Sequence, residues 1–146
     1  MSDITETREL KITRVFDAPR ELVFRCMITP EHLTHFWGPV GMSTPLSSIV
    51  IEPHAGGRFE STMVNDETGE EFPGRGIFVE VVEPEKLVWR EPDFGITCTS
   101  TFTDLGDGRT EVHIHQTDLP EQFATPDAEA GFNSSLDRFA AYLATL

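Results

Sequence analysis

Two pairs of histidines have the spacing best suited to binding a metal ion. His113 and His115 lie two positions apart and would share one face of a strand, whereas His32 and His35 lie three apart and would be neighbours on a helix. A metal site needs three or more donors that converge at about 2 Å. The apolar residues that alternate with the first pair occupy the expected inward face of the strand. We therefore expect His113 and His115 to point to solvent, and we predict no metal site.

The two cysteines and several carboxylates are the other candidates for catalysis. Cys26 lies late in a predicted helix, away from the helix N-terminus that would stabilise a thiolate, and Cys98 lies in mid-strand. The sequence contains no Gly-x-Ser-x-Gly, phosphate-binding glycine loop or His-Glu-x-x-His motif. A carboxyl group enclosed in a cavity could act as a general base, but most of the candidates are expected to face water. They are Glu52, Glu60, Glu80, Glu83 and Glu91. We predict no catalytic residue and no cofactor.

A dispersed set of aromatic, apolar and small hydroxyl residues has the chemistry of a ligand cavity instead. Ligand sites are mostly apolar, with a few polar groups that fix the orientation of the ligand. We expect this set to converge between a sheet and the last helix, with Ser61, Ser100 and Thr97 able to supply polar groups. The predicted ligand-binding residues are Trp37, Phe59, Ser61, Met63, Trp89, Ser100, Phe102, Phe132, Leu136 and Phe139. The same pattern also fits a filled hydrophobic core, and the residues alone leave both interpretations open.

The segment 51–63 indicates how part of this set is positioned. It reads as the end of one strand, a turn with two consecutive glycines at 56–57, and the start of another strand. Glycine accepts a positive φ or the close approach of another backbone. After the turn, Phe59, Ser61 and Met63 alternate with polar residues, which predicts one face toward the interior and one toward water.

The remaining elements follow from apolar periodicity and from helix-start signals. A proline followed by an acidic residue marks three helix starts, at Pro19, Pro30 and Pro126, and the third helix runs almost to the end of the chain. Its apolar residues Phe132, Leu136, Phe139 and Leu143 form one stripe. The second helix is expected to end near Phe36. Strands are predicted over 10–16, 45–52, 57–65, 71–82, 86–92, 96–104 and 110–117.

This order predicts an α+β fold. Seven antiparallel strands would form a curved sheet wrapped around the long C-terminal helix, with two short helices after the first strand. We expect a flexible N-terminus over 1–9 and a single domain over 10–146. The strand segment 76–82 is apolar on both faces. A β-bulge, a covered outer face or a homodimer contact would each account for it.

Composition excludes some classes of partner. The 146 residues carry a net charge of −14, which disfavours binding to nucleic acid and to anionic membrane surfaces. The N-terminus has no secretory signal, and no apolar run is long enough to span a membrane. Two cysteines do not make a disulfide framework. We therefore expect a cytoplasmic protein.

An ordered series of short motifs covers about residues 10–145 and resembles a known family. The motifs are Phe16-x-Ala18-Pro19-x-Glu21-x-Val23-Phe24, Thr29-Pro30-Glu31-His32-Leu33, Phe36-Trp37-Gly38-Pro39, Pro53-x-x-Gly56-Gly57-x-Phe59, Gly76-x-x-x-Glu80-Val81-x-x-Pro84-x-x-Leu87-Val88, Gly108-x-Thr110-x-Val112-x-Ile114, Leu119-Pro120 and Gly131-Phe132. Together they resemble the homologues of the activator of the heat-shock-protein-90 ATPase, C-terminal-domain type. That family belongs to the START/Bet v-type (SRPBCC) superfamily.

The resemblance implies a helix-grip fold, in which the sheet and the long helix enclose a deep cavity. Two positions depart from the family pattern. Phe36-Trp37 stands where two tryptophans are usual, and Gly131-Phe132 stands where Gly-Trp is usual. Eukaryotic co-chaperones of the family also carry a separate N-terminal chaperone-binding domain, for which this chain has no room. That difference argues against chaperone activation.

The leading hypothesis is therefore a non-enzymatic module that binds a hydrophobic or amphipathic small molecule between the sheet and the last helix. One alternative is a stress-related, co-chaperone-like interaction domain that uses its outer surface. Another is a small-molecule enzyme, such as a cyclase or hydrolase, that would need a titratable group inside the cavity.

Overall fold

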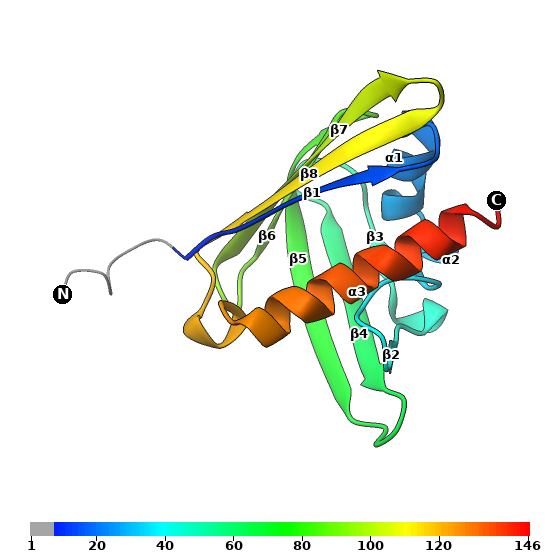
Figure 1. Cartoon of the computed structure of the whole chain (residues 1–146). Coiled ribbons are helices and arrows are strands. Elements are labelled where there is room, and N and C mark those ends of the chain that lie inside the picture. The colour runs from blue at the N-terminus through cyan, green and yellow to red at the C-terminus, as the bar shows by residue number, and fades with distance from the viewer. Residues whose placement is uncertain (1–7) are drawn as a thin grey trace.

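Antiparallel strands form one curved sheet in the computed structural model, which describes residues 8–146 (Figure 1). The strands are β1 (Leu10–Phe16), β2 (Met42–Ser43), β3 (Val50–Ile51), β4 (Arg58–Asn65), β5 (Glu71–Val82), β6 (Lys86–Glu91), β7 (Ile96–Gly106) and β8 (Arg109–Thr117). The helices are α1 (Arg20–Ile28), α2 (Pro30–Leu33) and α3 (Pro126–Leu143), with 3-10 turns η2 (Leu46–Ser48) and η3 (Glu121–Phe123). This confirms the predicted α+β class.

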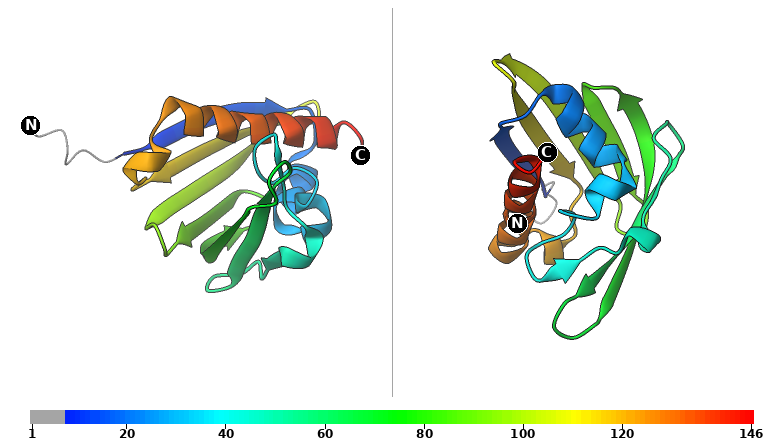
Figure 2. Two further views of the ribbon diagram at one scale, coloured as in Figure 1. Left: turned by 90° about the horizontal axis from the view of Figure 1, so that it is seen from below. Right: turned by 90° about the vertical axis from the view of Figure 1, so that its right-hand side faces the viewer.

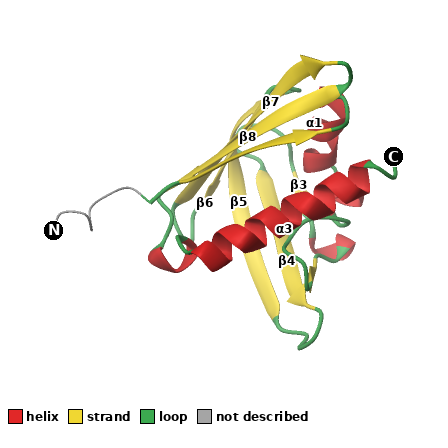
Figure 3. Cartoon of the chain, in the orientation of Figure 1, coloured by secondary structure: helices red, strands yellow, loops and turns green. Residues whose placement is uncertain are grey.

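The sheet runs in the order β1-β8-β7-β6-β5-β4-β2, and β3 also pairs with β4. The first strand of the chain, β1, pairs with the last, β8, and α3 follows β8 after the short turn η3. Figures 2 and 3 show α3 crossing within the curve of the strands, with the two shorter helices gathered on the same side. The arrangement is the predicted sheet wrapped around a long helix, with short helices after the first strand.

The helices begin where the sequence predicts. At α3, the Thr125 hydroxyl oxygen accepts a hydrogen bond from the backbone N–H of Ala128 at 3.1 Å, and Pro126 occupies the first turn. The second helix is shorter than predicted and ends at Leu33. Turns continue it, because the backbone N–H groups of Phe36 and Trp37 both donate to the Leu33 carbonyl oxygen. No helix among the described residues is long and apolar enough to cross a membrane.

The predicted strand over 45–52 is wrong over most of its length. The segment contains η2 and only the two-residue strand β3, and the two-residue strand β2 precedes it. Pro45 has no backbone N–H to donate to a ladder. The Ser48 hydroxyl donates to the Pro45 carbonyl oxygen at 2.7 Å and accepts from the backbone N–H of Thr62 on β4 at 3.1 Å. A side chain thus replaces a ladder hydrogen bond and allows the turn.

A β-bulge in β5 accounts for its two apolar faces. The pairing with β6 shifts register between Phe78 and Glu80, which leaves Val79 as the extra residue. Phe78 before the bulge is buried, and Val81 after it packs against the core. Ile77 and Val79 lie on the outer face, where they are 46% and 54% exposed. Of the three predicted explanations, the bulge is the one confirmed.

The flexible segment predicted over 1–9 can be compared with the structure only at Arg8 and Glu9. Residues 1–7 lie outside the described residues. Of the other two, the Arg8 carbonyl oxygen accepts from the Leu119 backbone N–H at 3.1 Å, and a Glu9 carboxylate oxygen lies 2.5 Å from His115 Nε2. Arg8 and Glu9 are therefore held against the end of β8 and the segment that follows it.

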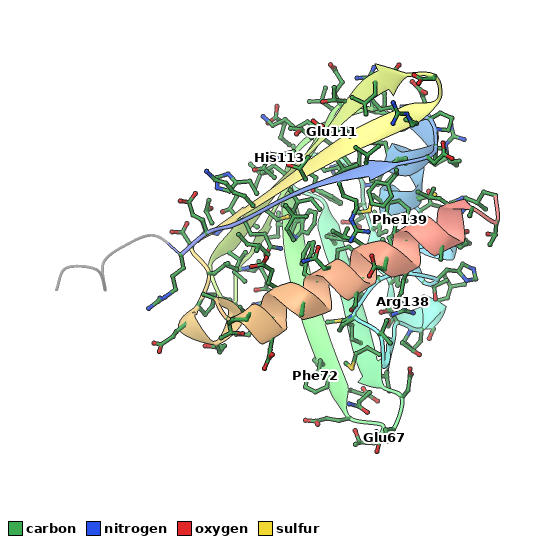
Figure 4. The ribbon with its side chains drawn as sticks, viewed as in Figure 1. Glu67, Phe72, Glu111, His113, Arg138 and Phe139 are labelled. Carbon is green, nitrogen blue, oxygen red and sulfur yellow. The ribbon has the colours of Figure 1, made fainter. Side chains whose placement is uncertain are left out.

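Phe139 is the central contact between α3 and the rest of the core. Its ring stacks on Phe36 with centroids 4.1 Å apart and packs against Phe16 at 4.9 Å. Leu136 and Leu143, one turn to either side along the helix, are also buried. In Figure 4, Phe139 lies on a different side of α3 from Arg138. The predicted apolar stripe thus faces the core.

We expect the replacement Phe139→Ala to lower the free energy of unfolding by about 3 kcal/mol or more, because the cavity left by a deleted core ring cannot collapse fully. Urea denaturation measures this loss. Phe72→Ala is a matched control at an exposed position of the β4–β5 hairpin, where the ring is 42% exposed (Figure 4). Similar losses in both variants would contradict the central role of Phe139.

Candidate ligand-binding cavity

A cavity of about 480 Å³ lies between α3 and the concave face of the sheet. The strands form one wall, because alternate side chains on each strand point inward. This wall consists of Leu10, Met63, Trp89, Ile96, Ser100, Ile114 and Gln116. The wall spans five strands of the sheet, so it depends on the inward-facing side chains of all five.

The inner face of α3 forms the opposite wall. Its lining residues recur at the helical spacing of three and four positions. They are Asp127, Ala128, Gly131, Phe132, Ser135, Leu136 and Phe139. Leu143, the last residue of the predicted stripe, lies beyond the cavity in the core. Leu136 and Phe139 belong both to the core and to the cavity lining, so α3 passes from cavity wall to core toward its C-terminal end.

The loop Phe36–Pro39 closes one side of the cavity and is fastened to α3. The Arg138 guanidinium donates through Nη1 to the carbonyl oxygens of Gly38 at 2.8 Å, Pro39 at 3.1 Å and Met42 at 3.0 Å. The Ser135 hydroxyl donates to the Phe36 carbonyl oxygen at 3.2 Å. A charged donor thus satisfies several loop carbonyls at once, which fixes the loop relative to the helix.

Gly38 is required at the tip of this loop for two reasons. Its φ is +102°, in a region that favours glycine. A Cβ at this position would also lie 2.9 Å from the Met63 sulfur, and Met63 lines the cavity. The positive φ is the stronger of the two reasons, because the Met63 side chain is flexible and can shift.

The segment between β8 and α3, together with the first turn of α3, forms the mouth of the cavity. Leu119, Phe123 and Asp127 line it, yet Asp127 is exposed and the Phe123 side chain is 37% exposed. A second hollow of about 500 Å³ adjoins this end and shares Leu10, Leu119 and Phe123 with the cavity. The cavity therefore meets solvent near the N-terminus of α3.

Seven of the ten predicted ligand-binding residues line this cavity. They are Trp37, Met63, Trp89, Ser100, Phe132, Leu136 and Phe139. The structure places the other three elsewhere. Phe59 is buried beneath the cavity against Phe78, with ring centroids 5.3 Å apart, and Phe102 packs on Phe24 of α1, also at 5.3 Å. Ser61 lies on β4 between Phe59 and Met63, but its short side chain does not line the cavity.

Sequence reasoning missed several lining residues. Gln116 is the most informative, because it continues the inward alternation of Val112 and Ile114 along β8. Its polar character hid that signal. Met27, Pro39 and Phe123 lie at the end of a helix or in loops, where no periodicity marks a direction.

The histidines take part in local hydrogen bonds. His113 Nδ1 lies 2.9 Å from the Thr13 hydroxyl on the neighbouring strand, and Figure 4 shows His113 on the outer strand pair, away from α3. His32 Nδ1 lies 2.5 Å from the Tyr142 hydroxyl. Among residues 8–146 no group of three His, Cys, Asp or Glu side chains is arranged to hold a metal ion.

The thiols and the carboxylates proposed as general bases lie outside the lining. Burial raises the pKa of the Cys98 thiol to about 12 and that of Cys26 to about 11, so both remain protonated at neutral pH. The hydrogen bond from the Arg58 backbone N–H lowers the pKa of Glu52. The carboxylate that does line the cavity is Asp127, which is exposed at the mouth.

Comparison with known proteins places the chain in a family. The model of the activator of Hsp90 ATPase homolog 1-like proteins matches residues 17–144, which is most of the chain. The chain belongs to this family. The match agrees with the resemblance in the sequence motifs and with the helix-grip architecture. A search of curated proteins finds no match.

Solved structures of bacterial proteins share the fold of this family member. A Chromobacterium violaceum protein is 22% identical, with a TM-score of 0.83 over 93% of this chain and 96% of that one. The AHSA1 protein of Silicibacter pomeroyi is 23% identical, with a TM-score of 0.78 over 94% and 98%. The AHSA1-like protein of Aeromonas hydrophila is 23% identical, with a TM-score of 0.77 over 93% of each chain. At these identities the likeness shows the fold.

We expect Arg138→Met to loosen the cavity loop, because the carbonyl oxygens of Gly38, Pro39 and Met42 lose their charged donor. The free energy of unfolding should fall by about 2 kcal/mol. Hydrogen exchange of the Val40 and Met42 amides should accelerate. Arg25→Met, at an exposed position of α1, is the matched control. Unchanged exchange in the Arg138 variant would contradict this role.

The buried Cys98 thiol also predicts a pH dependence. A thiol whose pKa is higher in the folded protein than its ordinary value of 9.0 stabilises the fold fully below that value. This stabilisation is lost as the pH rises from about 9 toward 12. Urea denaturation between pH 9 and 11 should therefore show a steeper loss of stability in the wild type than in Cys98→Ala. Equal slopes in the two proteins would show that burial does not raise the pKa of the Cys98 thiol.

Proposed function

We propose that this chain is a single module, spanning residues 10–146, that binds a hydrophobic or amphipathic small molecule in the cavity beneath α3. The observation that carries the proposal is the cavity itself. Its volume of about 480 Å³ falls within the range of about 300–1,000 Å³ that is usual for ligand sites. Protein interiors rarely leave voids larger than a water molecule. This space supports a ligand cavity over a filled core, the competing interpretation.

The lining supports binding of an apolar body. Aromatic side chains surround the cavity on all of its walls, and aromatic rings contribute large contact areas. They are Phe36, Trp37, Trp89, Phe123, Phe132 and Phe139. Folds of this superfamily commonly bind hydrophobic ligands, which agrees with this composition.

The enzyme and chaperone alternatives have less support among the described residues. A general base would need a carboxyl group enclosed in the cavity, whereas Asp127 is exposed at its mouth. Activation of the Hsp90 ATPase appears in the family's description, and the geometry described for residues 8–146 does not bear on a chaperone contact. A cytoplasmic location agrees with two buried free cysteines. Homodimerisation stays a prediction from the exposed apolar residues of β5.

Filling the cavity provides the test of this proposal. N-phenyl-1-naphthylamine is a neutral dye whose fluorescence rises in apolar surroundings, and we expect it to bind with saturable, one-site behaviour. Ala128→Trp should place an indole in the cavity and weaken binding by ten-fold or more, because Ala128 lines the cavity near its mouth. Ala141→Trp, on an exposed position of the same helix, should bind the dye as the wild type does.

Intrinsic fluorescence gives a second readout of the same titration. The chain contains two tryptophans, and both line the cavity. Their emission should change along the same binding curve as that of the dye. A dye signal that is equal in all three proteins, or that leaves the tryptophan emission unchanged, would place the dye elsewhere and overturn the proposal.

A further inference from the structure

A small polar patch interrupts the apolar sheet wall of the cavity. Ser100 on β7 and Gln116 on β8 both line the cavity, and Ser100 is 1% exposed. Cys98 faces Gln116 directly across the two strands, and Ser100 is its next inward neighbour on β7. The two polar side chains are thus diagonal neighbours on one face, with Cα atoms about 7 Å apart. We call Ser100 and Gln116 the polar patch.

Gln116, one member of the polar patch, spends part of its hydrogen-bonding capacity on sulfur. Gln116 Nε2 donates to Cys98 Sγ at 3.8 Å. Sulfur is a weak acceptor. A serine hydroxyl offers one donor and two acceptor positions, and a glutamine amide offers two donors and a carbonyl oxygen. Most of this capacity is left for a molecule in the cavity.

Other polar side chains in the protein, including the buried Thr44 and Thr110, are engaged more strongly. The buried Thr44 hydroxyl donates to the Trp37 carbonyl oxygen at 2.8 Å, and the buried Thr110 hydroxyl donates to the Ala18 carbonyl oxygen at 2.7 Å. Ser135 donates to the loop. These groups stabilise the fold, whereas the polar patch bonds only weakly within the protein and faces the cavity.

The charges around the cavity restrict what the polar patch can meet. No Lys, Arg or His side chain of the described chain lines the cavity, and its one charged lining residue is the acidic Asp127. The Arg138 guanidinium is directed to the loop carbonyls. A carboxylate or phosphate group inside the cavity would lose its hydration without gaining a counter-charge, which is costly.

We infer that the ligand is an uncharged amphipathic molecule whose buried end carries a hydroxyl or carbonyl group that hydrogen-bonds to the polar patch. The inference rests on the proposed function, because it requires the cavity to be occupied. The inference adds the chemical class of the ligand to that proposal. The aromatic walls hold the apolar body of the ligand, and Ser100 and Gln116 select a neutral polar group over both a methyl group and an anion.

A set of three probes with one ring system tests this selection by isothermal titration calorimetry at neutral pH. The probes are 2-naphthol, 2-methylnaphthalene and 2-naphthoate. In the wild type, 2-naphthol should bind about five-fold more tightly than 2-methylnaphthalene, the effect of about one net hydrogen bond. 2-Naphthoate should bind at least ten-fold more weakly than 2-naphthol, because its charge is buried without a partner.

The variant Ser100→Ala/Gln116→Met removes the polar patch and keeps its approximate shape. It should abolish the preference for 2-naphthol and leave the affinity for 2-methylnaphthalene unchanged or higher. Ser47→Ala, at an exposed position of η2, should retain the preference of the wild type. Urea denaturation of each variant confirms that the fold is retained.

The possible failures are distinguishable. Binding of all three probes with equal affinity, or a preference that survives in Ser100→Ala/Gln116→Met, would overturn this inference and leave the proposed function standing. Absence of binding by every probe, together with a failed dye titration, would overturn both.

Discussion

The stack of Phe139 on Phe36 determines how far α3 stands from the sheet. This contact, extended by Phe16 of β1, fixes the C-terminal half of the helix against the core. The sheet curves away beneath the other half, so the same straight helix cannot contact both regions. Space between them is therefore a geometric consequence of packing one rigid element against a curved one. The cavity lies where the helix and the sheet diverge.

Hydrogen bonds to the loop Phe36–Pro39 then close one side of that space. Arg138 and Ser135 lie on α3 one turn apart or less from Phe139, and both donate to backbone carbonyl oxygens of the loop or of the segment that follows it. The aromatic stack and these polar contacts thus arise from one stretch of helix. Loop, helix and core are held as a unit, while the mouth near Phe123 and Asp127 lies at the far end of the helix.

Local patterns predicted most of the fold because they are enforced locally. The alternation along β8 and the helix start at Pro126 depend on neighbouring residues, and both appear in the structure where they were expected. The strand over 45–52 failed because Ser48 bonds through its side chain to Thr62, a partner distant in the sequence. The periodicity of apolar residues along the chain does not indicate such side-chain contacts.

The candidate site was predictable as a face of the sheet and less so as a set of contacts. Met63 and Phe59 share a face of β4, yet one lines the cavity and the other packs beneath it against Phe78. That difference depends on the height of α3 above each strand, which no pattern along the chain encodes. Gln116 was missed for the opposite reason, since its inward direction was predictable but its polarity suggested solvent.

The contrast between the charged exterior and the neutral cavity also affects the kinetics of ligand arrival. A net charge of −14 creates a negative potential that repels anions and extends about 8 Å from the protein surface at physiological ionic strength. An anion would be slowed before it reached the mouth, and added salt would relieve that delay. A neutral molecule does not experience the field and arrives at a rate set by diffusion and by the width of the opening. The surface charge thus slows the association of anions, in addition to any selection by contacts inside the cavity.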